Sequence, residues 1–215
     1  MKKGLAFLVA LAIVAMPMAA KTILVNAAYN VHNDYSGIDD LHVRSIGMSL
    51  SFMKGEDSGI YAQVNPYFGL SMKGTSVVKF SDVDQTLLGA NFLIGYGGDL
   101  NFGTMGILLG GGLFADLNSY QYAAGSTFLF STGLGLGANF YFQPGEGNLV
   151  LNAGLMAAVS PWTFWSNDYV SDNYTDWGQS TINVNVGVGW RMGGGGSRSR
   201  NTGSSSPGGS GDDDW

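Results

Sequence analysis

The sequence has no cysteine and few charged residues. Charged side chains make up 12% of the 215 residues, against about 25% in an ordinary soluble domain. The lack of cysteine excludes disulfides, thiolate metal sites, cysteine nucleophiles and a lipid-modified cysteine. There is no lysine or arginine between Lys79 and Arg191, and the formal net charge is -6. A protein that binds nucleic acid needs a basic face, so we expect no nucleic-acid partner.

Long apolar runs are also missing. The apolar run at residues 5–15 is shorter than the roughly 20 residues that a membrane-spanning helix needs, and no later segment supplies such a run. It follows Lys2 and Lys3 and precedes Pro17 and a pair of alanines, which is the order of a secretory signal. We expect residues 1–20 to be a signal peptide, residues 21–192 to form one folded unit, and the Gly/Ser-rich residues 193–215 to be a disordered tail.

Glycine and strictly alternating apolar residues are abundant instead. In residues 127–143 every second side chain from Phe128 to Phe142 is apolar or threonine, and the side chains between them are mostly small or polar. This period of two is that of a β-strand. The alternation recurs in eight segments: 23–31, 46–52, 60–70, 88–96, 105–117, 128–142, 149–159 and 182–192. The polar faces carry almost no lysine or glutamate, so we expect them to face a confined interior and the apolar faces to lie outside.

The links between these segments alternate in length. Residues 54–59, 97–103 and 144–148 are tight and rich in turn residues, whereas the links at 33–41, 73–86, 118–126 and 161–179 are longer. Short turns at one end and long loops at the other are typical of transmembrane β-barrels. A sheet that turns apolar side chains toward lipid must also pair its first strand with its last. We therefore predict an all-β fold, an eight-stranded antiparallel up-and-down transmembrane β-barrel, with a bulge at Pro66.

The octamer NVGVGWRM at residues 185–192 fits the assembly signal of such barrels. Its four specified positions are Asn185, Gly187, Trp190 and Met192. On these grounds residues 21–192 resemble the small eight-stranded outer-membrane proteins of the OmpA, OmpX and OmpW type. The resemblance implies a bacterial outer-membrane location, contact with outer-membrane lipids and insertion by the barrel-assembly machinery. It also implies that the long loops are extracellular and both termini periplasmic.

Enzyme chemistry is poorly supplied. No phosphate-binding loop of the GxxxxGK type occurs. The only histidines, His32 and His42, flank the first long loop, which also holds Ser36 and several aspartates. We interpret these residues as an exposed polar loop, and we expect no catalytic residue, no metal site and no cofactor.

The predicted interior is unusual because its large side chains are mostly uncharged. Few charges have inward parity, mainly Asp116 and Arg191 toward opposite ends. Two arrangements are open: large side chains pack against glycines and seal the barrel, or the glycines leave a narrow, fairly apolar passage. The predicted lumen-lining residues are Tyr61, Tyr67, Leu93, Leu108, Phe114, Leu129, Gly135, Tyr141 and Met156.

The link at 161–179 is the second candidate site, because it combines aromatic and acidic side chains. Such a loop could bind a host or surface molecule. The alternative is that its first aromatics belong to the interfacial belt and the rest fold over the barrel mouth. The candidate binding residues are Trp162, Trp165, Asp168, Tyr169, Asp172, Tyr174, Asp176 and Trp177.

Two functions follow from these two sites. The first is a narrow passive conduit for small, partly hydrophobic solutes, as the resemblance to OmpW-type barrels implies. The second is a sealed structural or adhesive barrel that binds host or surface molecules through its outer loops. A soluble periplasmic barrel would need polar outward faces, and the rows of outward Leu and Phe argue against it.

Overall fold

A computed structural model describes residues 21–34, 40–55, 57–74, 76–80, 86–122, 125–145, 147–167 and 169–191, apart from the side chain of Tyr122. The predicted signal peptide, the tail and Met192 lie outside these residues. The strands are β1 (Thr22–Asn33), β2 (His42–Gly55), β3 (Ser58–Lys73), β4 (Val77–Lys79), β5 (Thr86–Asn101), β6 (Met105–Tyr122), β7 (Gly125–Phe142), β8 (Leu149–Asn167), β9 (Ser171–Thr175) and β10 (Ser180–Arg191). Within the described residues, no helix has the length and apolar character to cross a membrane.

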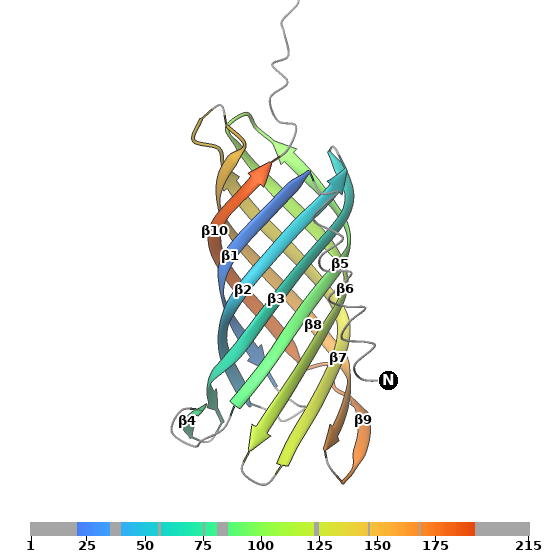
Figure 1. Ribbon diagram of the computed structural model, residues 1–215. Helices are drawn as coiled ribbons and strands as arrows, with labels where there is room; N and C mark the ends of the chain where they lie inside the picture. The colour runs from blue at the N-terminus through green and yellow to red at the C-terminus, as the bar shows by residue number, and fades with distance from the viewer. Residues whose placement is uncertain are drawn as a thin grey trace, which may run out of the picture.

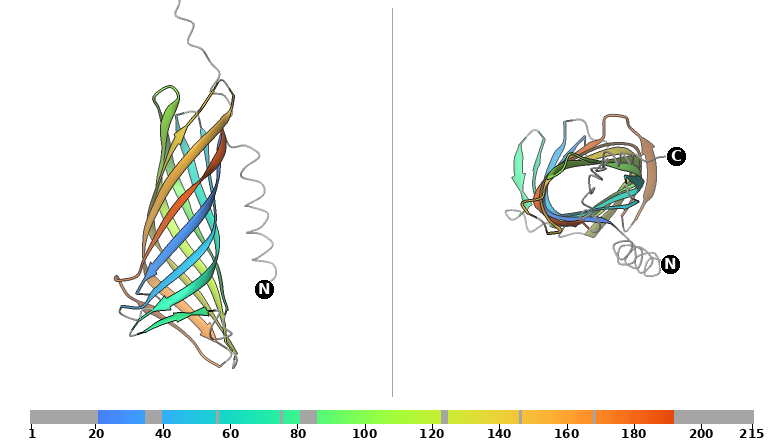
Figure 2. Two further views of the ribbon diagram at one scale, coloured as in Figure 1. Left: turned by 90° about the vertical axis from the view of Figure 1, so that its left-hand side faces the viewer. Right: turned by 90° about the horizontal axis from the view of Figure 1, so that it is seen from above.

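Eight long strands close into a ring, as the sequence predicts. The order is β10-β1-β2-β3-β5-β6-β7-β8, and β8 pairs with β10. All pairs are antiparallel. The first strand, β1, pairs with the last, β10, along its full length, from Thr22 opposite Arg191 to Asn33 opposite Ser180. Figure 2, seen from above, shows the closed ring, and Figure 1 shows the strong tilt of the strands. The predicted eight-stranded barrel is confirmed.

Side chains alternate across the wall as the sequence predicts. The inward series on β1 runs from Thr22 through Asn26 to His32, and each of its members is buried. The outward series on β7 includes Leu134 and Leu136, which are 62% and 70% exposed. Because strands close into a ring, one face of every strand lines the core and the other forms the outer surface.

Strands reach further than the apolar alternation does. The predicted loop at 118–126 is mostly strand, because β6 continues to Tyr122 and β7 begins at Gly125. The predicted loop at 161–179 is largely a hairpin, in which the end of β8 pairs with β9. Outward apolar residues mark the apolar belt, whereas the hydrogen-bonded ladder runs on into polar sequence. The predicted strands are therefore too short at the long-loop end.

The bulge predicted at Pro66 is wrong. Partners on β2 and β3 keep one register on both sides of it, with Gly47 opposite Tyr67 and Leu50 opposite Val64. A Cβ on Gly47 would come under 3.0 Å from the Pro66 carbonyl, so glycine lets the two backbones approach where the N–H is missing. The register shift between β2 and β3 instead lies at Arg44/Ser45, and β7 and β8 shift between Thr132 and Leu134.

Candidate functional site: the filled interior and the β8–β9 hairpin

All predicted lumen-lining residues face the interior. Tyr61, Leu108, Phe114 and Met156 are completely buried, and none of the remaining side chains of the set exceeds 4% exposure. Gly135, also buried, would bring a Cβ to 3.2 Å from Leu93 and from Ala158. Tyr61, Leu93, Leu108, Phe114, Tyr141 and Met156 belong to one apolar cluster. Whether any of them lines a solute path stays a prediction.

Interior glycines accommodate tyrosine rings. A Cβ on Gly110 would overlap the ring of Tyr61, and one on Gly137 would lie 2.5 Å from its hydroxyl oxygen. Gly89 relates in the same way to Tyr67, and Gly106 to Tyr141. The inward glycines therefore leave room for three tyrosine rings, and these rings fill the space that glycine side chains would otherwise occupy. Of the two arrangements that the sequence leaves open, the packing of these rings matches the sealed one.

Amide and hydroxyl side chains form a hydrogen-bonded network across the middle of the barrel. The Tyr61 hydroxyl donates to Gln63 Oε1 at 2.7 Å, and Gln63 Nε2 donates to Ser49 at 3.0 Å. Asn65 donates to Asn91 at 2.6 Å. A second chain crosses the seam between β1 and β10, and consists of Asn26, Asn185, Asn183, Asn30 and Ser45. Buried polar groups are tolerated in this way because partners replace the lost water.

The short-turn end of the interior contains an ion pair. Arg191 contacts Asp99 Oδ2 through both Nε and Nη2 at 3.1 Å. The Tyr141 hydroxyl donates to the other carboxylate oxygen at 2.5 Å, and the guanidinium lies 5.3 Å from the centre of the Tyr141 ring. The inward charge of Arg191 agrees with the sequence. Its partner was missed, because Asp99 falls in the predicted turn at 97–103, although it continues the inward parity of β5.

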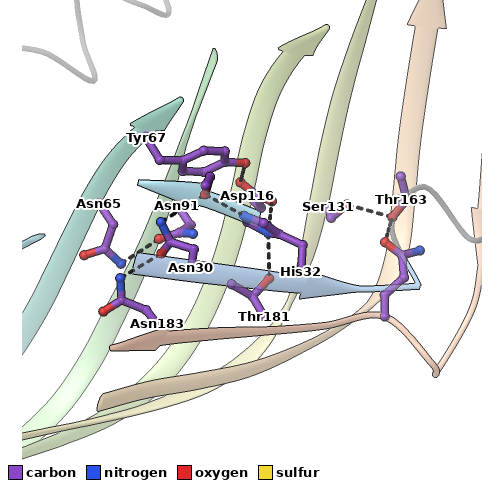
Figure 3. Close-up of polar contacts among 12 residues, drawn as sticks. Asn30, His32, Asn65, Tyr67, Asn91, Asp116, Ser131, Thr163, Thr181 and Asn183 are labelled. Carbon is purple, nitrogen blue, oxygen red and sulfur yellow. Dashed lines mark hydrogen bonds and ion pairs between the residues drawn. The ribbon is translucent and has the colours of Figure 1, made fainter. Parts of the chain in front are cut away.

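The long-loop end contains a different cluster, built around His32 (Figure 3). His32 Nδ1 lies 3.5 Å from Asp116 Oδ2 and 3.2 Å from the Thr181 hydroxyl. The Tyr67 hydroxyl donates to Asp116 Oδ1 at 2.7 Å, and its ring centre is 4.9 Å from that of His32. The sequence associated His32 with the first outer loop. The structure places it on β1, 2% exposed inside the barrel, because it extends the inward series of even-numbered residues.

A small cavity adjoins this cluster. Its volume is about 10 Å³, and its lining includes His32, Asp116, Ser131, Gln179 and Thr181. Ser131 and Thr163 share a hydrogen bond of 2.8 Å, and Thr163 donates to Gln179 at 3.0 Å. A cavity of this size holds about one water molecule.

Acid, imidazole and hydroxyl lie in a row here, which is the order of a hydrolytic triad. His32 Nε2 is 3.4 Å from the Ser45 hydroxyl, on the side of the ring opposite Asp116. Ser45, however, is completely buried, so a substrate could not approach its oxygen unless the barrel opened. Within the described residues, no three His, Cys, Asp or Glu side chains are grouped to hold a metal ion.

The candidate binding residues of the 161–179 segment separate into two groups. Trp162 belongs to the barrel wall, because its ring packs edge-on against that of Phe130, with 5.9 Å between the ring centres. Trp165 and Tyr174 are half-buried along the β8–β9 ladder. Tyr169 and Trp177 are 85% and 76% exposed, and Asp172 is exposed on β9. Asp176 accepts the backbone N–H of Gly178 at 2.8 Å, and Asp168 lies outside the described residues.

The described part of the predicted assembly signal lies on β10. Asn185 points inward and accepts a hydrogen bond from Asn26, while Trp190 points outward and is 48% exposed. Gly187 lies opposite Asn26 on the neighbouring strand, where a Cβ would meet the Asn26 backbone. The role of these residues in assembly stays a prediction.

Comparisons with known proteins support the fold. No protein-family model matches the sequence, and no curated protein matches it. The crystal structure of Neisserial surface protein A (NspA) is similar over 80% of this chain and 96% of that chain, with 16% identity and a TM-score of 0.50. A second similar structure is Ail, the attachment invasion locus protein of Yersinia pestis, in complex with the heparin analogue sucrose octasulfate; it has 13% identity, 80% and 97% coverage and a TM-score of 0.47.

A third is a major outer membrane protein from Thermus thermophilus, with 10% identity, coverage of 79% of this chain and 99% of that chain, and a TM-score of 0.41. At such low identities a structural similarity is evidence for the fold alone. The similarity to NspA is the one that supports the fold here. The predicted resemblance to small outer-membrane barrels is confirmed at the level of the fold.

Proposed function

We propose that the protein is a bacterial outer-membrane barrel with a sealed interior, which binds surface molecules through the β8–β9 hairpin. Its apolar outer face supports the membrane location, since side chains such as Leu136 and Phe140 are 70% and 60% exposed in continuous outward rows. Exposing so much apolar surface to water is unfavourable, whereas contact between this surface and the hydrocarbon core of a bilayer is favourable. Outer-membrane lipids and the barrel-assembly machinery are the partners that this proposal requires.

We assign the long-loop end to the outside of the cell. In outer-membrane barrels the short turns face the periplasm. Strand β1 begins at the short-turn end, and β10 ends there at Arg191, opposite Thr22 (Figure 1). Both ends of the barrel segment therefore lie on the periplasmic side in this proposal.

The observations that support the sealed interior are the contacts between inward side chains at its two ends. Asp99 and Arg191 join β5 to β10 at one end, and Tyr67, Asp116 and His32 join β3, β6 and β1 at the other. Between them the inward side chains are buried, and Tyr61, Gln63 and Asn65 are among those that are hydrogen-bonded. A solute would have to displace these groups, each of which would then lose a buried partner at a cost of about 1–3 kcal/mol.

The conduit is tested by single-channel recording of the refolded protein in a planar bilayer. Preparations whose gel mobility shifts on heating serve as the folded sample. We expect no conductance steps from the wild type. Reproducible steps that disappear in Gly135→Trp would overturn the sealed interior and favour the narrow passage, because Gly135 faces Leu93 across the interior.

The hairpin is supported as the binding surface by its exposed aromatic rings and its acidic groups. Tyr169 and Trp177 extend from the long-loop end of the barrel, and Asp172 lies between them in the chain. Exposed rings beside carboxylates fit a partner with arginine or lysine side chains, through cation–π contacts and charge. We therefore propose a basic protein surface as the partner.

This second part of the proposal is tested with proteoliposomes and immobilised peptides of graded charge. We expect binding that increases with the number of Arg and Lys residues and that is lost when residues 166–176 are deleted. The matched control is a proteoliposome carrying Phe102→Ser, which removes an exposed ring from the turn between β5 and β6 at the other end of the barrel. Equal binding by the hairpin deletion and the wild type would exclude the hairpin.

A further inference from the structure

The outer face of β2, β3 and β4 presents a cationic cluster at the long-loop end, consisting of Arg44, Lys73 and Lys79. Ser71 on β3 pairs with Arg44 on one side and with Lys79 on the other, so these three residues form one row across the strands. Lys73 pairs with His42 and lies two residues further along the same face. With a strand spacing of about 4.8 Å, the backbones of Arg44 and Lys79 are about 10 Å apart.

The direction of these side chains follows from their neighbours. Val43, which precedes Arg44 on β2, and Phe80, which directly follows Lys79 after the end of β4, are buried in an apolar cluster on the opposite face. Arg44, Lys73 and Lys79 themselves are exposed. Three positive side chains therefore share one outward surface only three strands wide.

Acidic partners do not neutralise the cluster within the described residues. The close contacts between basic and acidic side chains found there are His32–Asp116 and Arg191–Asp99, both inside the barrel. Asp34, in the link between β1 and β2, accepts the N–H of Asp40 at 2.9 Å and approaches Gly178 with its other oxygen. The six described lysines and arginines divide equally: Lys21, Lys54 and Arg191 lie at the short-turn end, and the cluster has the other three.

An apolar groove begins one outward row below the cluster. Its open volume is about 580 Å³, and its lining includes Ala27, Tyr29, Ile46, Met48 and Phe68. Ile46 follows Arg44 by two residues on β2, a step of about 7 Å along the strand, and pairs with Phe68 on β3. Met48 and Phe68 are 51% and 47% exposed, so the groove opens outward.

We propose that this surface binds the headgroup and one acyl chain of a phosphate-bearing lipid. Phosphate oxygens accept charge-assisted hydrogen bonds from arginine and lysine, and two or three cations at this spacing suit a phosphate monoester or a pair of phosphates. The chain attached to that headgroup would lie along Ile46 and Met48. The inference rests on the membrane location proposed above, but not on the sealed interior or on the hairpin.

The test is native mass spectrometry of the full-length protein, refolded in a neutral detergent and titrated with phosphatidic acid or phosphatidylcholine of the same chains. We expect a preference for phosphatidic acid of about tenfold or more. Each cation near a phosphate contributes roughly a fivefold change in affinity, so Arg44→Gln/Lys73→Gln/Lys79→Gln is expected to weaken binding about 100-fold. The control is Lys21→Gln/Lys54→Gln, at the other end of the barrel, which should change the affinity for phosphatidic acid less than about twofold.

Two further measurements identify the ligand. Ala27→Trp fills the groove without changing charge, and we expect it to weaken phosphatidic acid binding several-fold. Inorganic phosphate at millimolar concentration should not displace the lipid. Unchanged binding by the triple variant overturns the site, and displacement by phosphate together with no effect of Ala27→Trp overturns the lipid in favour of a free phosphate ion. A heat-dependent gel shift of every variant confirms that the barrel has folded.

Discussion

The two ends of the barrel interior contain different polar clusters. At the short-turn end an arginine and an aspartate form a doubly contacted ion pair, with Tyr141 on the remaining oxygen. At the long-loop end Asp116 has no arginine or lysine beside it among the described residues, and it is held by Tyr67 and His32. The first end depends on two opposite charges, whereas the second depends on hydrogen bonds that neutral side chains could largely reproduce. The difference teaches which substitutions each end should tolerate.

Arg191→Met should give the largest effect, because it leaves the Asp99 carboxylate, 2% exposed, without its counter-ion. Breaking a buried ion pair on one side costs about 3–5 kcal/mol. We expect a loss of about 3 kcal/mol in the free energy of unfolding, measured by urea titration of the refolded barrel in lipid vesicles. Arg191→Met/Asp99→Asn should recover most of the loss. A double variant as unstable as the single one would show that charge is not the reason.

Gly110→Ala tests the packing between the two ends. The added methyl group overlaps the Tyr61 ring, and overpacking of a filled interior costs about 1–3 kcal/mol. The matched control is Gly145→Ala, because a Cβ there has nothing within 4 Å. We expect the first variant to lower the urea midpoint and the second to leave it unchanged. Equal stability of both variants would mean that the interior has spare room, and the conduit would gain support.

Asp116→Asn should cost less than the loss of Arg191, because an amide oxygen can still accept the Tyr67 hydroxyl. The expected loss is about 1 kcal/mol, the size of one buried hydrogen bond. Asp99→Asn, measured in parallel by urea unfolding, should cost clearly more because it leaves Arg191 unpaired. If the two substitutions cost the same, the contrast between the ends is wrong.

Trp177→Ser should have the smallest effect on stability, within about 0.5 kcal/mol, because the side chain is 76% exposed. Its effect on binding to basic peptides should be larger, and several-fold weaker retention of proteoliposomes is the expected result. The two measurements together separate a binding residue from a structural one. A variant that loses stability but keeps binding would contradict the assignment.

The sequence predicts the wall of this barrel better than its ends. Period-two alternation assigned Leu134 outward and Gly135 inward because the two faces meet different surroundings, and the closing of the ring required β1 to pair with β10. Strand ends were placed too early, since apolar alternation stops at Leu117 while the ladder continues to Tyr122. Continuing the inward parity by one or two steps would have found both His32 and Asp99.

Partnerships between inward side chains could not be predicted. Asn65 bonds to Asn91 and Asn26 to Asn185 because of strand register, which alternation alone leaves undetermined. The cationic cluster depends on β4, a strand of three residues inside a segment expected to be a loop. Its pairing with β3 is what brings Lys79 beside Ser71. Sequence reasoning places residues on faces, and register then decides which of them meet.

The seam between the first and last long strands has a consequence for the order of folding. Asn26 and Asn185 are 159 positions apart in the chain, yet their side chains form a hydrogen bond of 2.6 Å. We expect contacts at such separation to form late, because the entropy of the intervening loop must be lost before they form. Until β10 arrives, the growing sheet has two open edges and no complete interior. A chain that stopped before Ser180 would therefore be a sheet without closure, a state that quality control could distinguish from the finished barrel.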